Sequence, residues 1–124
     1  MTPELADTAI IIARILVGAL FIIGGLRHFP VLDAMTAAMK ERGVPQARLV
    51  LIVGSIYQIV LGITLALGLF AAASALGLIL FTVLATVMML NFWDKEGPQR
   101  AALFNGFMSN VAIIGGLLAL AATG

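Results

Sequence analysis

Four long apolar stretches, with charged residues confined to the short segments around them, constrain this chain more than any other feature. They cover residues 8–26, 49–69, 71–92 and 101–122. A helix that crosses a bilayer needs about 20 apolar residues, because each residue adds about 1.5 Å toward a hydrocarbon core of about 30 Å. With 62% hydrophobic and 10% charged residues, the 124-residue chain is too apolar for a water-soluble domain of this size. The sequence therefore predicts an all-α membrane protein, one domain forming an antiparallel bundle of four transmembrane helices.

The second and third stretches follow each other without a charged residue. As a single helix, residues 49–92 would be about 65 Å long, roughly twice the thickness of the hydrocarbon core. We therefore expect a short turn within residues 68–74 at the membrane surface. The prolines, which cost least outside a helix interior, all fall outside the predicted spans, at Pro3, Pro30, Pro45 and Pro98.

The connection between the first two spans is patterned like a short amphipathic helix. Its apolar residues recur at helical spacing and its polar residues take the other side: Leu32, Met35 and Met39 against Asp33, Thr36, Lys40 and Glu41. Such a helix lies in the plane of the membrane interface and would end at Gly43. An ordered loop is the alternative.

Basic residues predict the orientation. They occur in the first and third connections, at Arg27, Lys40, Arg42, Arg48, Lys95 and Arg100, whereas both termini and the central turn have no Lys or Arg. The positive-inside rule then places both termini on the non-cytoplasmic side. The net charge of +1 gives no indication of a nucleic-acid partner.

Arg14 is the one charged residue within a predicted span. A central arginine costs roughly 2.5–3.5 kcal/mol on insertion scales, which the surrounding aliphatic residues offset. Its helix face also holds Gly18, Phe21, Gly25 and His28. Arg14 could anchor the helix by reaching the interface or pairing with Glu4 or Asp7, or it could bind a ligand, a proton or a partner.

Other polar residues are candidates for a binding site. Gln58 shares a face with Gly54 and Gly62 near the middle of the second span, where it could link helices or line a site. A second group is expected in the cytoplasmic half: Arg27, His28, Asn91, Asn105 and Ser109, and Asn110 of the fourth span is a further candidate. This group could form a pocket for a lipid headgroup or a quinone ring, or could simply be solvated helix ends.

Several kinds of chemistry are excluded within one chain. There is no cysteine and only one histidine, so disulfides, thiol chemistry, iron–sulfur clusters and multi-histidine metal sites are not expected. No nucleophile–base motif is present either. We expect no metal, no cofactor except a quinone or lipid, and no catalysis by the chain alone.

The motifs together resemble the DoxX family of small bacterial integral membrane proteins. Arg14 to Gly18 and Gly24 to Phe29 resemble its opening signature, and Arg42 to Pro45 is similar to its Gly-Ile-Pro turn. The glycines at 62 and 68, Phe92-Trp93, and the stretch 110–120 resemble later motifs. The resemblance implies a bacterial inner membrane protein.

The family pattern has a glutamate where Gln58 stands, a histidine where Asn91 stands and a lysine where Arg27 stands. Gln58 and Asn91 can hydrogen-bond but do not ionise. Because the family name comes from a subunit of a thiosulfate–quinone oxidoreductase, the resemblance implies an accessory or anchor subunit of a membrane redox complex. The alternative is a small oligomeric transporter or permease. The partners expected are the lipid bilayer, membrane oxidoreductase subunits and further copies of the chain.

Overall fold

The computed structural model describes residues 1–90 and 92–123, which form helices connected by short turns and no strand. The helices are α1 (Pro3–Leu26), α2 (Leu32–Glu41), α3 (Ala47–Leu67), α4 (Ala71–Met89) and α5 (Gly97–Thr123), with 3-10 turns at Phe29–Val31 (η1) and Phe92–Asp94 (η2). Four helical segments, containing α1, α3, α4 and α5, are long and apolar enough to cross a membrane. The predicted all-α class with four spanning helices is confirmed.

The helices end where the backbone can satisfy its free polar groups. α1 begins earlier than the apolar stretch at residue 8, because the Thr2 hydroxyl accepts a hydrogen bond from the amide of Leu5 at 3.2 Å. α3 ends at Leu67. Its C-cap, Gly68, has a φ of +75°, and the amide of Leu69 donates to the carbonyl of Thr64 at 2.8 Å. The chain then reverses within the predicted range 68–74.

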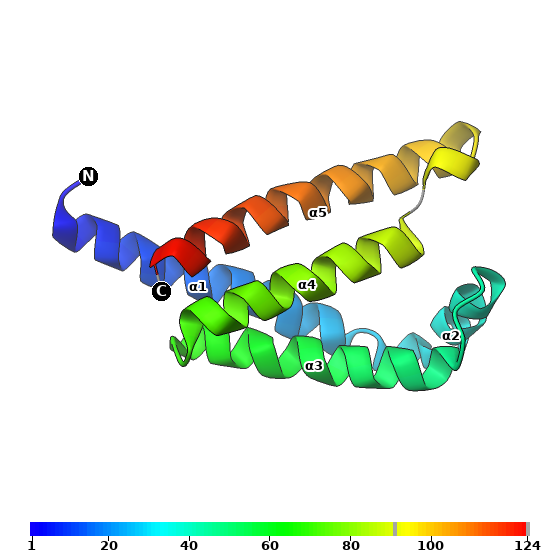
Figure 1. Ribbon diagram of the computed structural model, residues 1–124, viewed down its shortest axis with the longest axis horizontal. Helices are drawn as coiled ribbons and strands as arrows, with labels where there is room; N and C mark the ends of the chain where they lie inside the picture. Colours follow the sequence, from blue (N-terminus) through cyan, green and yellow to red (C-terminus); the bar gives the residue numbers. More distant parts are fainter. Residues whose placement is uncertain (91, 124) are drawn as a thin grey trace.

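The two strongest helix pairings are α1 with α3 and α4 with α5, and α3 against α4 joins the two pairs (Figure 1). α1 and α3 approach closely at Gly18, where an added Cβ would lie 2.6 Å from the carbonyl oxygen of Gly62. Since lipid offers no hydrophobic driving force between helices, such close backbone contact is a main source of helix association in a membrane. The small-residue face predicted on the second span is therefore used inside the bundle.

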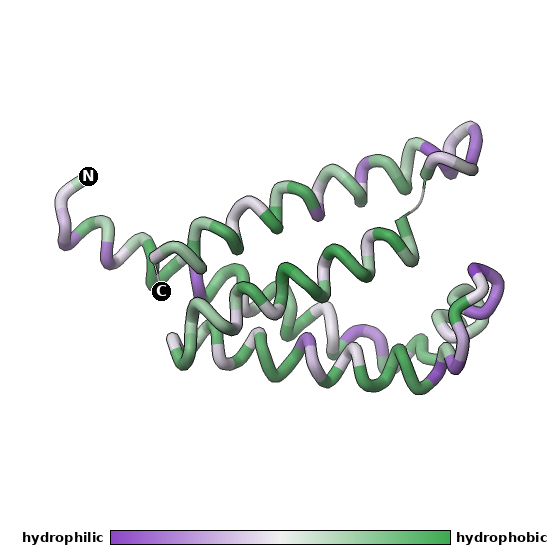
Figure 2. The backbone as a smooth tube through the Cα atoms, viewed as in Figure 1, coloured by the Kyte–Doolittle hydropathy of each residue, from purple (hydrophilic) through white to green (hydrophobic). Residues whose placement is uncertain are grey.

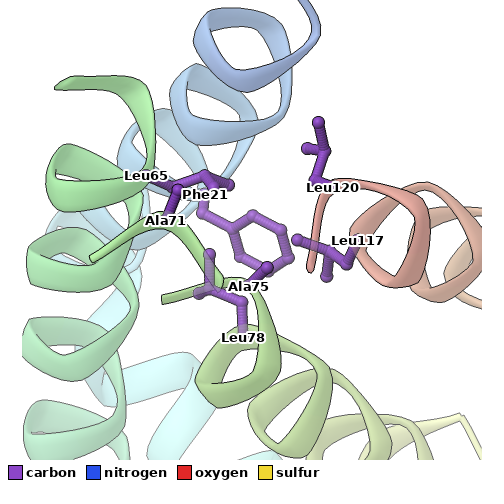
Figure 3. Packing of buried hydrophobic residues seen from close by; sticks show 7 residues of the cluster. All are labelled: Phe21, Leu65, Ala71, Ala75, Leu78, Leu117 and Leu120. Carbon is purple, nitrogen blue, oxygen red and sulfur yellow. The ribbon is translucent and has the colours of Figure 1, made fainter. Parts of the chain in front are cut away.

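The main hydrophobic core lies toward the α3–α4 turn. Phe21 points its ring from α1 toward α4 and α5, where it meets Ala75 and Leu117 (Figure 3). The other buried members of this core are Leu65, Ala71, Leu78 and Leu120. This core closes one end of the bundle and leaves the other end to a second, smaller core.

The second core is made by α2, which packs against the first turns of α3 through Met39, Ala47 and Leu51. The predicted amphipathic helix is therefore present, but it covers the end of the bundle, and an ion pair of 2.8 Å between Arg48 and Asp33 adds to the α2–α3 contact. One detail of the pattern is wrong: Thr36, assigned to the polar side, is buried. A helix that packs on a neighbouring helix buries a wider face than one that only lies in the plane of the membrane interface.

Polar residues gather at the end of the molecule that carries α2 and η2, whereas the middle of the bundle is hydrophobic (Figure 2). Because the α1–α3 and α4–α5 connections lie at this same end, the six basic residues of those connections do too (Figure 1). We call it the α2 end.

Candidate functional site

A cavity of about 530 Å³ lies between the two cores, toward the α2 end. Residues from α1, α2, α3, α4 and α5 line it, and most are apolar, including the methionines Met35, Met39, Met88 and Met89. Five polar side chains also line it: His28, Ser55, Gln58, Thr82 and Asn110. Ligand sites for small molecules have this size and this mixture of apolar walls with a few polar groups.

A groove on the outer surface between α3 and α4 adjoins the cavity. The two share Val50, Gly54, Phe81 and Leu84, and the remaining groove residues, such as Leu49 and Leu80, are apolar too apart from Tyr57. Tyr57 links the two helices beside this groove, because its hydroxyl donates to the carbonyl of Gly77 at 2.8 Å. In a bilayer this groove faces hydrocarbon, so lipid-soluble molecules can reach the outer side of the residues that it shares with the cavity.

Gln58 lies near the middle of α3 and is buried. Its Nε2 donates a hydrogen bond of 2.9 Å to the carbonyl oxygen of Phe21 in α1, and the absence of a side chain at Gly24 leaves room for the amide. Its Oε1 is buried without a hydrogen-bond partner in the part of the chain that the structure describes. Because only an NH₂ group can donate to a carbonyl, Oε1 must be the atom left over. Gln58 thus links helices and also lines a cavity.

His28 lies two residues beyond the end of α1, outside the spanning helix. Its Nδ1 is 2.8 Å from Oγ of Ser55, which donates its own proton to the carbonyl of Leu51 at 2.7 Å. Since a serine hydroxyl has one proton, Nδ1 of His28 must be the donor. Burial lowers the pKa of His28 below its usual 6.5, so at pH 7 the ring is neutral and Nε2 is an acceptor.

Two threonine hydroxyls lie on one face of α4, and a hydrogen bond from Asn110 to one of them joins α5 to α4. Thr82 donates to the carbonyl of Leu78 at 2.7 Å, Thr86 donates to the carbonyl of Thr82 at 2.6 Å, and Nδ2 of Asn110 donates to Oγ1 of Thr86 at 2.9 Å. No described residue bonds to Oδ1 of Asn110. The two threonine hydroxyls are thus fully committed as donors, whereas the amide retains its oxygen.

Arg14 lies far from this cavity. Its guanidinium packs on Gly68 at the α3–α4 turn, within 3.3 Å of the position that a Cβ would take there. Gly68 is ten residues from Gln58 along α3, or about 15 Å. Neither Glu4 nor Asp7 pairs with Arg14 in the described structure, and its buried Nε makes no hydrogen bond there. The negative end of the α3 dipole lies beside the guanidinium and favours its charge.

The remaining candidate residues from the sequence do not line the cavity or are not described by the structure. Arg27, Asn105 and Ser109 are exposed and do not line the cavity, although they are at its end of the bundle. Asn91 lies outside the described residues. Of the described members of the expected cytoplasmic-half group, the structure thus brings only His28 to the cavity, where the other candidates Gln58 and Asn110 also lie.

Sequence reasoning missed the hydroxyls of this site. Ser55 is 1% exposed, and Thr82 and Thr86 are buried. The signal for the threonines was their spacing of four in an otherwise apolar span, which places both on one helix face. No group of three or more potential metal-ligating side chains occurs among residues 1–90 and 92–123.

Comparison with known proteins supports the resemblance seen in the motifs. The DoxX family model matches residues 9–91. The inner membrane protein YphA of Escherichia coli (strain K12) is 31% identical over 115 residues, which is 93% of this chain and 82% of that protein. No match was found among solved structures.

Proposed function

Since this chain belongs to the DoxX family and is a multi-pass inner membrane protein, we propose that it is an accessory or anchor subunit of a quinone-linked membrane complex. In this role it holds a quinone or a similar lipophilic molecule in the cavity at the α2 end. The observation that carries the proposal is the cavity itself, with apolar walls, a few polar groups and an adjoining groove that faces lipid.

The residues present fit a lipophilic ring. Met35, Met39 and Met88 provide flexible, polarisable side chains that adapt to an irregular apolar surface. Gln58 and Asn110 each keep an amide oxygen and one N–H for the ligand. A bound quinone supplies two-electron redox chemistry; the chain's own residues orient the ring and exclude water from it. The partner subunit would carry the redox centre that exchanges electrons with it.

The alternative, a small oligomeric transporter, is motivated by the polar residues Arg14 and Gln58 near mid-depth of their predicted spans. Their separation in the bundle leaves it with less support. Oligomerisation itself remains part of the proposal: Gly116 on α5 has open space where a side chain would be, which suits a second copy.

The proposed orientation has both termini on the non-cytoplasmic side, because the α2 end carries the basic residues. Single-cysteine variants Thr2→Cys and Lys95→Cys test it in intact cells. A membrane-impermeant maleimide should label the first and not the second; the opposite pattern would reverse the orientation.

Binding is tested by purifying the protein in mild detergent and extracting bound lipophilic molecules for mass spectrometry. Gly54→Leu puts a large side chain into the cavity wall while replacing a glycine with a better helix former. Gly115→Leu makes the same change where no atom lies within 4 Å of an added Cβ.

We expect a quinone, together with membrane oxidoreductase subunits, to co-purify with the wild type and with Gly115→Leu. Gly54→Leu should lose the quinone. If the extracts contain no quinone under several detergents, or if both variants retain it equally, the proposed site is wrong.

A further inference from the structure

The hydrogen-bonding groups of the cavity point to the kind of oxygen that its ligand presents. This step rests on the proposed function and concerns the same site. Each polar side chain there has donors and acceptors, and counting those already used inside the protein leaves the ones available to a ligand.

The hydroxyl donors are used. Ser55 and Thr82 both donate to carbonyls of their own helices, and Nδ1–H of His28 donates to Ser55. Each amide has also spent one of its two N–H groups, Gln58 on the carbonyl of Phe21 and Asn110 on Thr86. One N–H therefore remains on each amide.

The acceptors are mostly unused. Oε1 of Gln58 is buried without a partner, Oδ1 of Asn110 bonds to no described residue, and Nε2 of neutral His28 is a lone-pair acceptor. Of these, Oε1 matters most, since Gln58 is 6% exposed. A buried acceptor without a donor is costly, so the site gains from any ligand that supplies one. Because the terminal torsion of a glutamine amide is broad, a small rotation that keeps the bond from Nε2 to Phe21 can turn Oε1 toward such a donor.

A ketone oxygen only accepts, so it can pair with a remaining amide N–H but leaves Oε1 unpaired. A hydroxyl both donates and accepts, and so it can satisfy the amide oxygen and an amide N–H. We infer that the cavity selects a lipophilic ring bearing a hydroxyl group, the reduced quinol form, over the oxidised quinone. Gln58 stands near the middle of α3, too deep for the hydroxyl of a lipid headgroup that remains at the surface.

A pair of probes that differ only in the donor tests this inference: 4-nonylphenol and its methyl ether. Binding to the full-length protein in nanodiscs is measured by titration calorimetry, with protein-free nanodiscs subtracted. Decylubiquinol and decylubiquinone form a second pair. We expect the hydroxyl-bearing member of each pair, 4-nonylphenol or decylubiquinol, to bind about tenfold more tightly than the other member. This is the effect of satisfying one buried acceptor.

Gln58→Met keeps the volume and removes the acceptor, so the preference should fall to within about twofold. Ser109→Ala, on an exposed position next to Asn110, should keep it. If the wild type binds both members of each pair equally, and Gly54→Leu abolishes both, the selectivity is wrong while the proposed site stands. If a preference persists in Gln58→Met, Gln58 is not its source. If neither probe binds above the protein-free background, the proposed function fails instead. The difference in affinity between the two members of each pair, measured on the wild type, tests the selectivity even if Gln58→Met does not fold.

Discussion

The contact between α1 and α3 at Gly18 gives a sharp test of how the bundle is held together. In Gly18→Ala the new Cβ would lie 2.6 Å from the carbonyl oxygen of Gly62 and 2.9 Å from Cβ of Ala66. Ordinary van der Waals contact begins at 3.4 Å. Both neighbours belong to α3 and neither is the end of a flexible side chain, so the helices must move apart.

The size of the effect follows from two opposing terms. Overpacking a tight interface costs about 1–3 kcal/mol, and separation also weakens the neighbouring α1–α3 contacts. Alanine favours the helix over glycine by about 1 kcal/mol, which offsets part of this cost. We expect Gly18→Ala to be less stable than the wild type by about 1–2 kcal/mol.

The matched control is Gly115→Ala on α5, whose added Cβ meets nothing within 4 Å. It should be neutral or slightly more stable, since only the helix-propensity term acts. Unfolding of both variants in mixed micelles is followed by circular dichroism as the mole fraction of dodecyl sulfate increases. If Gly18→Ala is as stable as Gly115→Ala, α1 and α3 do not make the described contact.

Three further predictions concern other parts of the bundle. Leu65→Ala should lower the free energy of unfolding by about 2–4 kcal/mol in the same titration, because Leu65 is 0% exposed within the main core; a change below 1 kcal/mol would contradict that packing. Asn110→Leu removes the hydrogen bond to Thr86 and should cost about 0.6 kcal/mol, whereas Asn105→Leu on the exposed face should cost nothing; equal effects would refute the bond. Because burial lowers the pKa of His28 below 6.5, the unfolded chain binds a proton at this residue at a higher pH than the folded chain does, and stability is lost as the pH falls below about 6.5. The melting temperature should therefore drop less between about pH 7.5 and 5.0 in His28→Gln than in the wild type. An identical drop in both proteins would argue against a buried neutral ring.

The helices could be predicted because one physical constraint, the thickness of the hydrocarbon, sets their length whatever they pack against. Gln58 and His28 could be selected as site residues for a similar reason. A polar group among apolar neighbours needs a partner, and both residues found one across helices, at Phe21 and Ser55.

The position of Arg14 could not be predicted in the same way. Its depth depends on how far α1 slides along α3, and that offset is set by the close approach at Gly18 and Gly62 rather than by α1 alone. The pairing places Arg14 beside Gly68, at the end of α3, although the apolar stretch of α1 continues past it.

Which polar residues of α5 face inward was equally beyond single-helix reasoning. Asn110 shares a face with the buried Leu117, whereas Asn105 and Ser109 lie on exposed positions. The rotation of α5 about its axis decides between them, and that rotation is fixed by its packing on α4. Neither the composition nor the residue spacing of α5 gives this rotation directly.

Photolabelling tests the central claim, that the cavity receives a lipophilic ring from the bilayer, most directly. An azido-substituted quinone is incorporated into native membranes, irradiated, and the labelled residues are identified by peptide mass spectrometry. The account predicts labels on cavity-lining segments of α3 and α4, around residues 50–58 and 84–90, and their loss in Gly54→Leu. Labels spread evenly over the lipid-facing residues of all helices, unchanged in that variant, would contradict it.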